Sequence, residues 1–169
     1  DLGIKNIVAT SDGDVYTNPK LTNKYADKLA SAQRAKNKKK VSRLHRKIGR
    51  MRKDNLHKIS TELTNKYRNI FIGEKKKKKD KNTNDASFRG LIPLLKYKAS
   101  RLNGIAEEIS EAYSTITCNN CLDKTGPIGL TGLSVREWTC GSCGQIHERD
   151  INAAKNILAF GYKGLKTSN

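Results

Sequence analysis

The sequence predicts a mixed α/β protein in which helices pack against a central sheet. Three observations lead to this prediction: a hairpin pattern opens the chain, a short apolar run occupies 69–74, and an amphipathic helical pattern covers 150–160. Strands that alternate with helical segments usually form layers around one core. The length of 169 residues suits one domain, and a hydrophobic content of 36% supplies a modest core for it.

The first 17 residues carry the hairpin pattern. The segments IVAT and VY flank SDGD, in which Gly13 offers the backbone freedom that a tight turn needs. Asn18 and Pro19 then predict a helix start, with asparagine as the cap and proline in the first turn. Because the strand pattern is already under way at Asp1, we expect the chain to be the C-terminal portion of a larger protein.

A basic helical hairpin is expected over about 20–67. Two apolar stripes at helical spacing, separated by the turn-forming segment AKNKKK, predict two helices that pack against each other. The stripes consist of Leu21, Tyr25 and Leu29, and of Val41, Leu44, Ile48 and Met51, continued after a slip near 54–55 by Ile59, Leu63 and Tyr67. The outer face is either a solvated surface or a phosphate-contacting one, and its basic residues include Arg43, Arg46, Lys47 and Arg50.

The remaining elements alternate between strand and helix. The apolar run NIFIGE is typical of a buried strand, and the lysine-rich stretch after it predicts a loop. A helix is expected over 86–102, where Pro93 requires a late start or a kink, and Asn103-Gly104 ends it. A strand within 105–116 follows, and the last helix begins at DINAAKNIL.

The charge balance predicts a polyanionic partner. The chain has 34 basic and 16 acidic residues, a net charge of +18. No apolar run reaches the length of a membrane span and no signal-peptide pattern opens the chain, so nucleic acid is a better candidate than a lipid surface. The other interpretation of the charge is a solubilising surface.

All four cysteines lie in two C-x-x-C pairs, eighteen residues apart. Such pairs let both thiolates of each pair reach one ion, so Cys118, Cys121, Cys140 and Cys143 predict a closed tetrahedral zinc site. A disulfide framework is the alternative, and it fits a lysine-rich chain without a secretion signal poorly. A site with four sulfur ligands has no open position, so the zinc is expected to be structural. Trp138 is expected to pack on this module, and His147 to support the site or lie on the surface.

Three acids occupy the ends of expected central elements. Asp1 lies on the first strand, Glu74 follows a buried strand, and Asp150 heads the last helix. Carboxylates brought together in one pocket repel each other, and Mg²⁺ or Mn²⁺ relieves that repulsion. Taken singly, Asp150 is more simply explained as a helix cap, and Glu74 can be explained as a salt-bridged surface residue. Spacing alone does not decide between these interpretations.

The sequence segments around the acids and cysteines resemble those of a known family. The segments DLGIKNIVATSDG, KDNLHKIS, FIGE, the two cysteine pairs and HERDINAAKNIL are similar to the RuvC-like nuclease core of the TnpB proteins of insertion-sequence transposons, a core that compact type V CRISPR effectors share. The segment GPIGLTGLSVREWTCGSCG resembles the zinc-ribbon insert of the same family. The resemblance extends from residue 1 to about 160.

The resemblance implies an RNase H-like (RuvC) fold with a mixed sheet and flanking helices. It implies a RuvC-like core over 1–113 with the helical insertion at about 20–67, a zinc ribbon over 114–147 and a final RuvC segment over 148–169. Asp1, Glu74 and Asp150 match the three acids of the RuvC active site. The implied activity is RNA-guided, divalent-metal-dependent cleavage of DNA by a two-metal mechanism, with Mg²⁺ or Mn²⁺ at the acids and Zn²⁺ at the cysteines. A guide RNA and target DNA are the implied partners.

Further residues are expected to contact nucleic acid. They are Arg43, Arg46, Lys47 and Arg50 on the hairpin, Lys75, Lys76 and Lys77 after the second acid, and Arg149 beside the third. The chain departs from the family in lacking its N-terminal portion and in placing Leu122 where a glycine is usual. Without that portion, this piece is expected to have weak activity or none.

Two other functions are compatible with the sequence. One is a non-catalytic nucleic-acid-binding or repressor-like member of the same family, which the missing N-terminal portion favours and the retained acids oppose. The other is a structure-specific resolvase that uses no RNA. In each case the expected location is the cytoplasm of a prokaryote, in association with the nucleoid.

Overall fold

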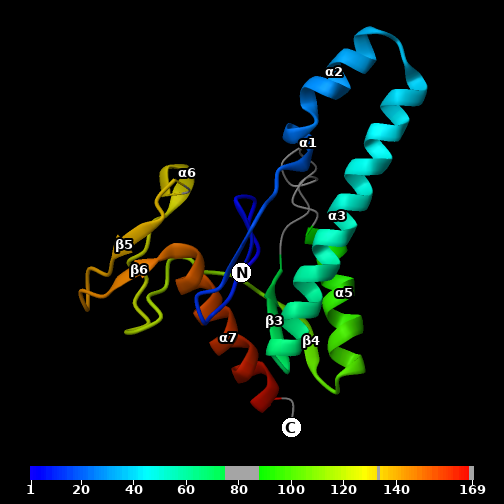
Figure 1. Ribbon diagram of the computed structural model, residues 1–169. Helices are drawn as coiled ribbons and strands as arrows, with labels where there is room; N and C mark the ends of the chain where they lie inside the picture. Colours follow the sequence, from blue (N-terminus) through cyan, green and yellow to red (C-terminus); the bar gives the residue numbers. More distant parts are fainter. Residues whose placement is uncertain (75–87, 133, 168–169) are drawn as a thin grey trace.

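The computed structural model describes residues 1–74, 88–132 and 134–167 and confirms a mixed α/β fold (Figure 1). In chain order the elements are β1 (Asn6–Ala9), β2 (Val15–Thr17), α1 (Leu21–Lys24), α2 (Ala26–Arg34), α3 (Lys38–Lys66), β3 (Asn69–Gly73), α5 (Phe88–Arg101), β4 (Ile105–Ile109), α6 (Gly129–Gly132), β5 (Glu137–Thr139), β6 (Ile146–Glu148) and α7 (Arg149–Thr167). In the described part of the chain, no helix combines the length and apolarity that crossing a bilayer requires.

The strands of the described residues pair two by two. β1 pairs with β2 and β5 with β6 in antiparallel fashion, whereas β3 and β4 are parallel. The sequence predicts one mixed sheet, and hydrogen bonds do not join these pairs into one. A cavity of about 350 Å³ lies between the β1–β2 pair and the β3–β4 pair, and Val8 and Ala9 of β1 and Ile70 and Ile72 of β3 line it. The backbones of β1 and β3 are therefore not in ladder contact.

The N-terminal hairpin forms as predicted. Gly13 has a φ of 95° in the turn, a backbone conformation that glycine adopts without steric cost. The backbone of Asp1 exchanges two hydrogen bonds with Ala9, so the first residues add a short third segment beside β1. The predicted helix cap at Asn18 is wrong: α1 begins at Leu21, and Asn18 instead accepts a hydrogen bond from the Lys20 amide at 2.9 Å in a local turn.

Helices α2 and α3 form the predicted hairpin, which extends away from the rest of the molecule (Figure 1). Asn37 caps α3 by accepting a hydrogen bond from the Lys40 amide at 2.9 Å. The predicted slip near 54–55 does not interrupt α3, which is continuous over 29 residues. The two apolar stripes meet in one small core, made of Leu21, Tyr25, Leu29 and Ile48 with Val41, Leu44 and Met51 at its edge.

A second, larger core joins the C-terminal half of α3 to α5, β1 and β3. Its buried members are Leu2, Ile7, Val8, Leu56, Ile59, Leu63, Ile72, Leu91 and Leu95. Pro93 lies inside α5 without ending it, and Asn103, with a φ of 53°, terminates the helix as predicted. The predicted strand within 105–116 is confirmed but stops at Ile109.

Helix α7 packs against β3 at a glycine. A Cβ atom at Gly161 would overlap the ring of Phe71, so only glycine allows this approach.

We expect Gly161→Ala to lower the free energy of unfolding by roughly 1–3 kcal/mol, as overpacked core substitutions do. Urea unfolding followed by circular dichroism measures the change. Gly49→Ala on the exposed side of α3, where a Cβ meets no atom, is the matched control and should raise stability by up to about 1 kcal/mol. Equal effects at both positions would contradict the packing argument.

Candidate functional site

The four cysteines form one compact cluster, as the sequence predicts. Their Sγ atoms all lie within 4.8 Å of one another, with 3.7 Å between Cys118 and Cys143 and 3.6 Å between Cys121 and Cys140. Tetrahedral zinc with metal–sulfur bonds of about 2.3 Å places its ligands about 3.8 Å apart. The donor set and spacing therefore fit a structural zinc ion, held by four thiolates.

Two knuckles with the same hydrogen-bond pattern build this cluster. In the first, the Leu122 amide donates to Cys118 and the Cys118 amide to Asp123; in the second, the Gly144 amide donates to Cys140 and the Cys140 amide to Gln145. The residue after the second cysteine of each pair has a left-handed backbone, with φ of 69° at Leu122 and 71° at Gly144. Each turn points both thiols of its pair toward the same point.

Hydrogen bonds from neighbouring polar groups lower the pKa of two of the thiols. The Thr125 hydroxyl donates to Cys140 Sγ at 3.1 Å and lowers the pKa of that thiol to about 6, and a hydrogen bond from Asn120 lowers the pKa of Cys143. A hydrogen bond from the Asp123 backbone lowers the pKa of Cys121, but burial and the adjacent thiols outweigh it and raise that pKa to about 12. Near neutral pH the cluster thus offers a thiolate, the form that binds metal.

Trp138 and His147 close one side of the cluster. Both are buried, and their ring centroids lie 4.6 Å apart. His147 Nε2 is 3.0 Å from Cys118 Sγ, and burial followed by the charge of Lys155 lowers the pKa of His147. A neutral imidazole donates one hydrogen bond, so His147 supports the Cys118 ligand. A surface position for His147, one of the two predicted alternatives, is wrong.

Leu122 occupies a strained position. Its left-handed backbone costs a residue with a Cβ roughly 1–2 kcal/mol, and its side chain is 62% exposed, so little packing offsets that cost. We expect Leu122→Gly to tighten zinc binding by about fivefold, equivalent to about 1 kcal/mol. Competition with a chromophoric chelator measures the affinity. Gly144→Ala, at the equivalent position of the second knuckle, should weaken binding by a similar factor; the same sign at both positions would refute the strain argument.

Asp150 lies at the start of α7 but does not cap it. The two carboxylate oxygens of Glu148 accept hydrogen bonds from the backbone amides of Asp150 and Ile151, at 3.4 and 3.2 Å. Glu148 is therefore the capping side chain. The buried carboxylate of Asp150 instead faces Asn6 Nδ2 at 3.4 Å.

Two arginines flank the same carboxylate. Arg136 Nη1 and Arg149 Nη2 each lie 3.5 Å from an oxygen of Asp150. Arg149 also donates to the Gly132 carbonyl at 3.0 Å and its side chain is only 14% exposed, so it connects the end of α6 to the start of α7. Arg136 is 41% exposed and reaches Asp150 from the segment just before β5. Asn6 and Arg136 lie within segments that resemble the family, but neither their type nor their spacing singles them out, so they were not predicted.

The three predicted catalytic acids do not form a ligand cluster in the part of the chain that the structure describes. Asp1 lines the 350 Å³ cavity together with Ile72 of β3 and Ala154 of α7. Glu74 is exposed directly after β3, and Asp150 precedes Ala154 by one helical turn. Over the described residues, the cysteine cluster is the one group close enough to share an ion. The shared metal site of the acids stays a prediction.

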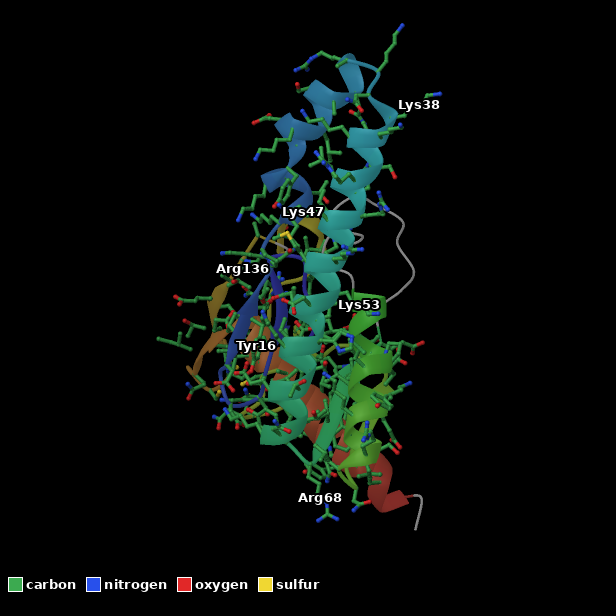
Figure 2. All side chains as sticks on the ribbon, turned by 45° about the vertical axis from the view of Figure 1, so that its right-hand side comes forward. Tyr16, Lys38, Lys47, Lys53, Arg68 and Arg136 are labelled. Atoms are coloured by element: carbon green, nitrogen blue, oxygen red, sulfur yellow. The ribbon has the colours of Figure 1, made fainter. Side chains whose placement is uncertain are left out.

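The predicted phosphate-contacting residues divide into three groups. Arg43, Arg46, Lys47 and Arg50 are exposed on α3. Figure 2 shows side chains that end in nitrogen along this hairpin, with Lys38, Lys47 and Lys53 labelled on α3. Arg149 points into the protein, and Lys75, Lys76 and Lys77 lie outside the described residues.

Comparison with known families assigns both halves of the chain. Residues 1–82 match the OrfB_IS605 family model, described as "Probable transposase", and residues 88–157 match the model "Cas12f1-like, TNB domain". The fold is thus that of the transposon-encoded OrfB proteins and their Cas12f1-like relatives. The chain belongs to the TnpB family.

Individual relatives agree with this assignment. A Streptomyces pristinaespiralis protein named "Putative RNA-guided DNA endonuclease" is 35% identical over 95% of this chain and 44% of its own length. The Acanthamoeba polyphaga mimivirus "TnpB-like protein L79" is 36% identical over 76% of this chain and 27% of its own. The chain in a Cas12f1–sgRNA–target DNA complex shares the fold, with a TM-score of 0.70 and 18% identity over 92% of this chain and 47% of that one. The chain therefore spans about half the length, or less, of these proteins.

Proposed function

We propose that this chain is the nuclease portion of an RNA-guided DNA endonuclease that depends on a divalent metal. The observation that carries the proposal is the carboxylate of Asp150. Glu148 performs the capping role at this helix end, so the helix does not need Asp150 as its cap, and the buried carboxylate of Asp150 faces Asn6 of β1 and two arginines. The names of the TnpB relatives support the same activity for the whole protein.

In this proposal the residues of the chain divide the work. Asp1, Glu74 and Asp150 would hold two Mg²⁺ or Mn²⁺ ions, which lower the pKa of water and offset charge on the leaving oxygen. Arg136 and Arg149 keep positive charge beside Asp150, which favours an approaching phosphate. The core and ribbon boundaries follow the resemblance: 1–113, 114–147 and 148–169.

The basic helical hairpin supplies affinity that does not depend on sequence. Arg43, Arg46, Lys47 and Arg50 are exposed along one long helix, where their charges can neutralise phosphates of a nucleic-acid backbone. Sequence choice would lie with a guide RNA.

Purification of the natural full-length protein tests the function. We expect RNA to copurify, and DNA complementary to that RNA to be cut in Mg²⁺ but not in EDTA or after RNase treatment. Cleavage that survives RNase would favour the resolvase interpretation. Binding of RNA and DNA without metal-dependent cleavage would favour a non-catalytic binder. In that case the ion pairs of Asp150 with Arg136 and Arg149 would be structural contacts.

A further inference from the structure

Helix α7 is fastened to the metal module by two buried asparagines. Asn152 and Asn156 are 1% and 2% exposed and lie one helical turn apart, so both amides project from the same face. Buried carboxamides are costly unless they are fully hydrogen-bonded. Both therefore need partners in the chain that packs on this face.

The partners are two carbonyl groups just before Cys118. Asn152 Nδ2 donates to Ser114 at 3.3 Å and to Thr117 at 2.8 Å, and Asn156 Nδ2 donates to the same carbonyls at 2.8 and 2.7 Å. Two NH₂ groups thus meet two carbonyls in a square of four hydrogen bonds, which uses every proton of both amides. Carbonyls accept only, so the orientation of both carboxamides is fixed by chemistry.

A fifth bond continues the connection into the first knuckle. The Oδ1 of Asn152 accepts a hydrogen bond from the Asn119 amide at 3.0 Å, one residue beyond Cys118. The segment 114–119 is therefore held to α7 on both sides of that ligand. His147 provides a second connection. Its Nε2 lies 3.0 Å from Cys118 Sγ, and His147 precedes Asp150 by three residues in the chain.

We propose that Asn152 and Asn156 couple occupancy of the cysteine site to the position of Asp150. The metal fixes Cys118, Cys118 fixes segment 114–119, and the asparagine square fixes the first turns of α7. Because coupling between two sites is reciprocal, whatever orders α7 also strengthens metal binding. The inference concerns α7 and the metal, and it needs no nuclease activity.

Hydrogen exchange of the natural full-length protein, with zinc bound or chelated, tests the coupling. Chelation should speed exchange of the 151–158 amides by at least about tenfold and leave the 56–63 amides of α3 unchanged. In Asn152→Ala and Asn156→Ala, zinc should no longer protect 151–158. Zinc affinity, measured by chelator competition, should fall about tenfold in each variant because buried carbonyls lose their donors.

Asn65→Ala replaces an exposed asparagine of α3 and is the matched control, expected to behave as wild type. Asn152→Asp keeps the Oδ1 acceptor but removes both donors, so it should act like Asn152→Ala. Unchanged exchange of 151–158 on chelation would overturn the proposal, as would full protection by zinc in the alanine variants. Faster exchange that extends equally into α3 would also overturn it, because the effect would then be loss of the whole fold. None of these readouts involves cleavage, so they stand apart from the test of the proposed function.

Discussion

Removing zinc should unfold segment 114–147, and this is the largest change in stability that we expect. In small modules of this kind, metal binding and folding are one event, with apparent binding free energies of roughly 10–16 kcal/mol at neutral pH. The module has only a minor apolar core, in which Trp138 packs on Cys118 and Cys140 beside Cys121 and Val135. Without the ion, these few contacts do not offset the chain entropy of the segment.

The sole tryptophan of the chain reports this unfolding. Trp138 is buried beside the cluster, so its fluorescence should shift to the red when a chelator is added and return with zinc. Cys118→Ser should give the shifted spectrum even in excess zinc, because Cys118 is fully buried and contacts both Cys143 and His147. Ser142→Ala, an exposed position inside the second knuckle, should leave the spectrum unchanged. A native spectrum in the chelated protein would mean that apolar packing alone holds the module.

Asp150→Ala should abolish DNA cleavage by the natural full-length protein, the largest expected change in activity. A metal ligand at a reacting phosphate contributes several kcal/mol, and each 1.4 kcal/mol is a factor of ten, so we expect a loss of roughly 10³-fold or more. Cleavage rates under single-turnover conditions, with RNA and DNA held constant, measure it.

The controls separate chemistry from folding. Asp150→Ala leaves Arg136 and Arg149 without their carboxylate, which itself affects stability. Asp150→Asn also removes the charge but keeps the shape and an oxygen that accepts from Asn6, so it should lower the melting temperature less than Asp150→Ala and still lose cleavage. Asp54→Asn, in an exposed ion pair with Lys58 on α3, should leave both unchanged. Cleavage by Asp150→Asn at the wild-type rate would exclude a catalytic role for Asp150.

Local patterns in the sequence predict the elements and the zinc module well. The two cysteine pairs, the turn at Gly13 and the stripes of α3 depend on interactions between near neighbours, and all are observed. The start of α1 was misplaced because the Asn18 side chain satisfies a turn instead of a helix end. An asparagine side chain can accept a hydrogen bond either in a turn or at a helix end. The local backbone geometry decides between the two, and the sequence alone does not reveal it.

Long-range arrangements were harder to predict. The strands divide into pairs, and a cavity lined by residues far apart in the sequence lies between β1 and β3. The capping role of Glu148 was missed because Asp150, two residues later, is an equally good capping type. A signal for the asparagine pair was present: Asn152 and Asn156 stand at i, i+4 on the face that also carries Ala153 and Ile157, where polar residues need a partner.

Among the described elements, helix α3 contributes both to the small core of the helical hairpin and to the larger core. Its second half is anchored by the larger core through Leu56, Ile59 and Leu63, whereas Ile48 is its single fully buried contribution to the smaller one. Opening the outer hairpin consequently costs less free energy than opening the larger core. The hairpin can open and close locally while the strands and α7 keep their places. Opening of the hairpin would therefore leave the residues around Asp150 undisturbed.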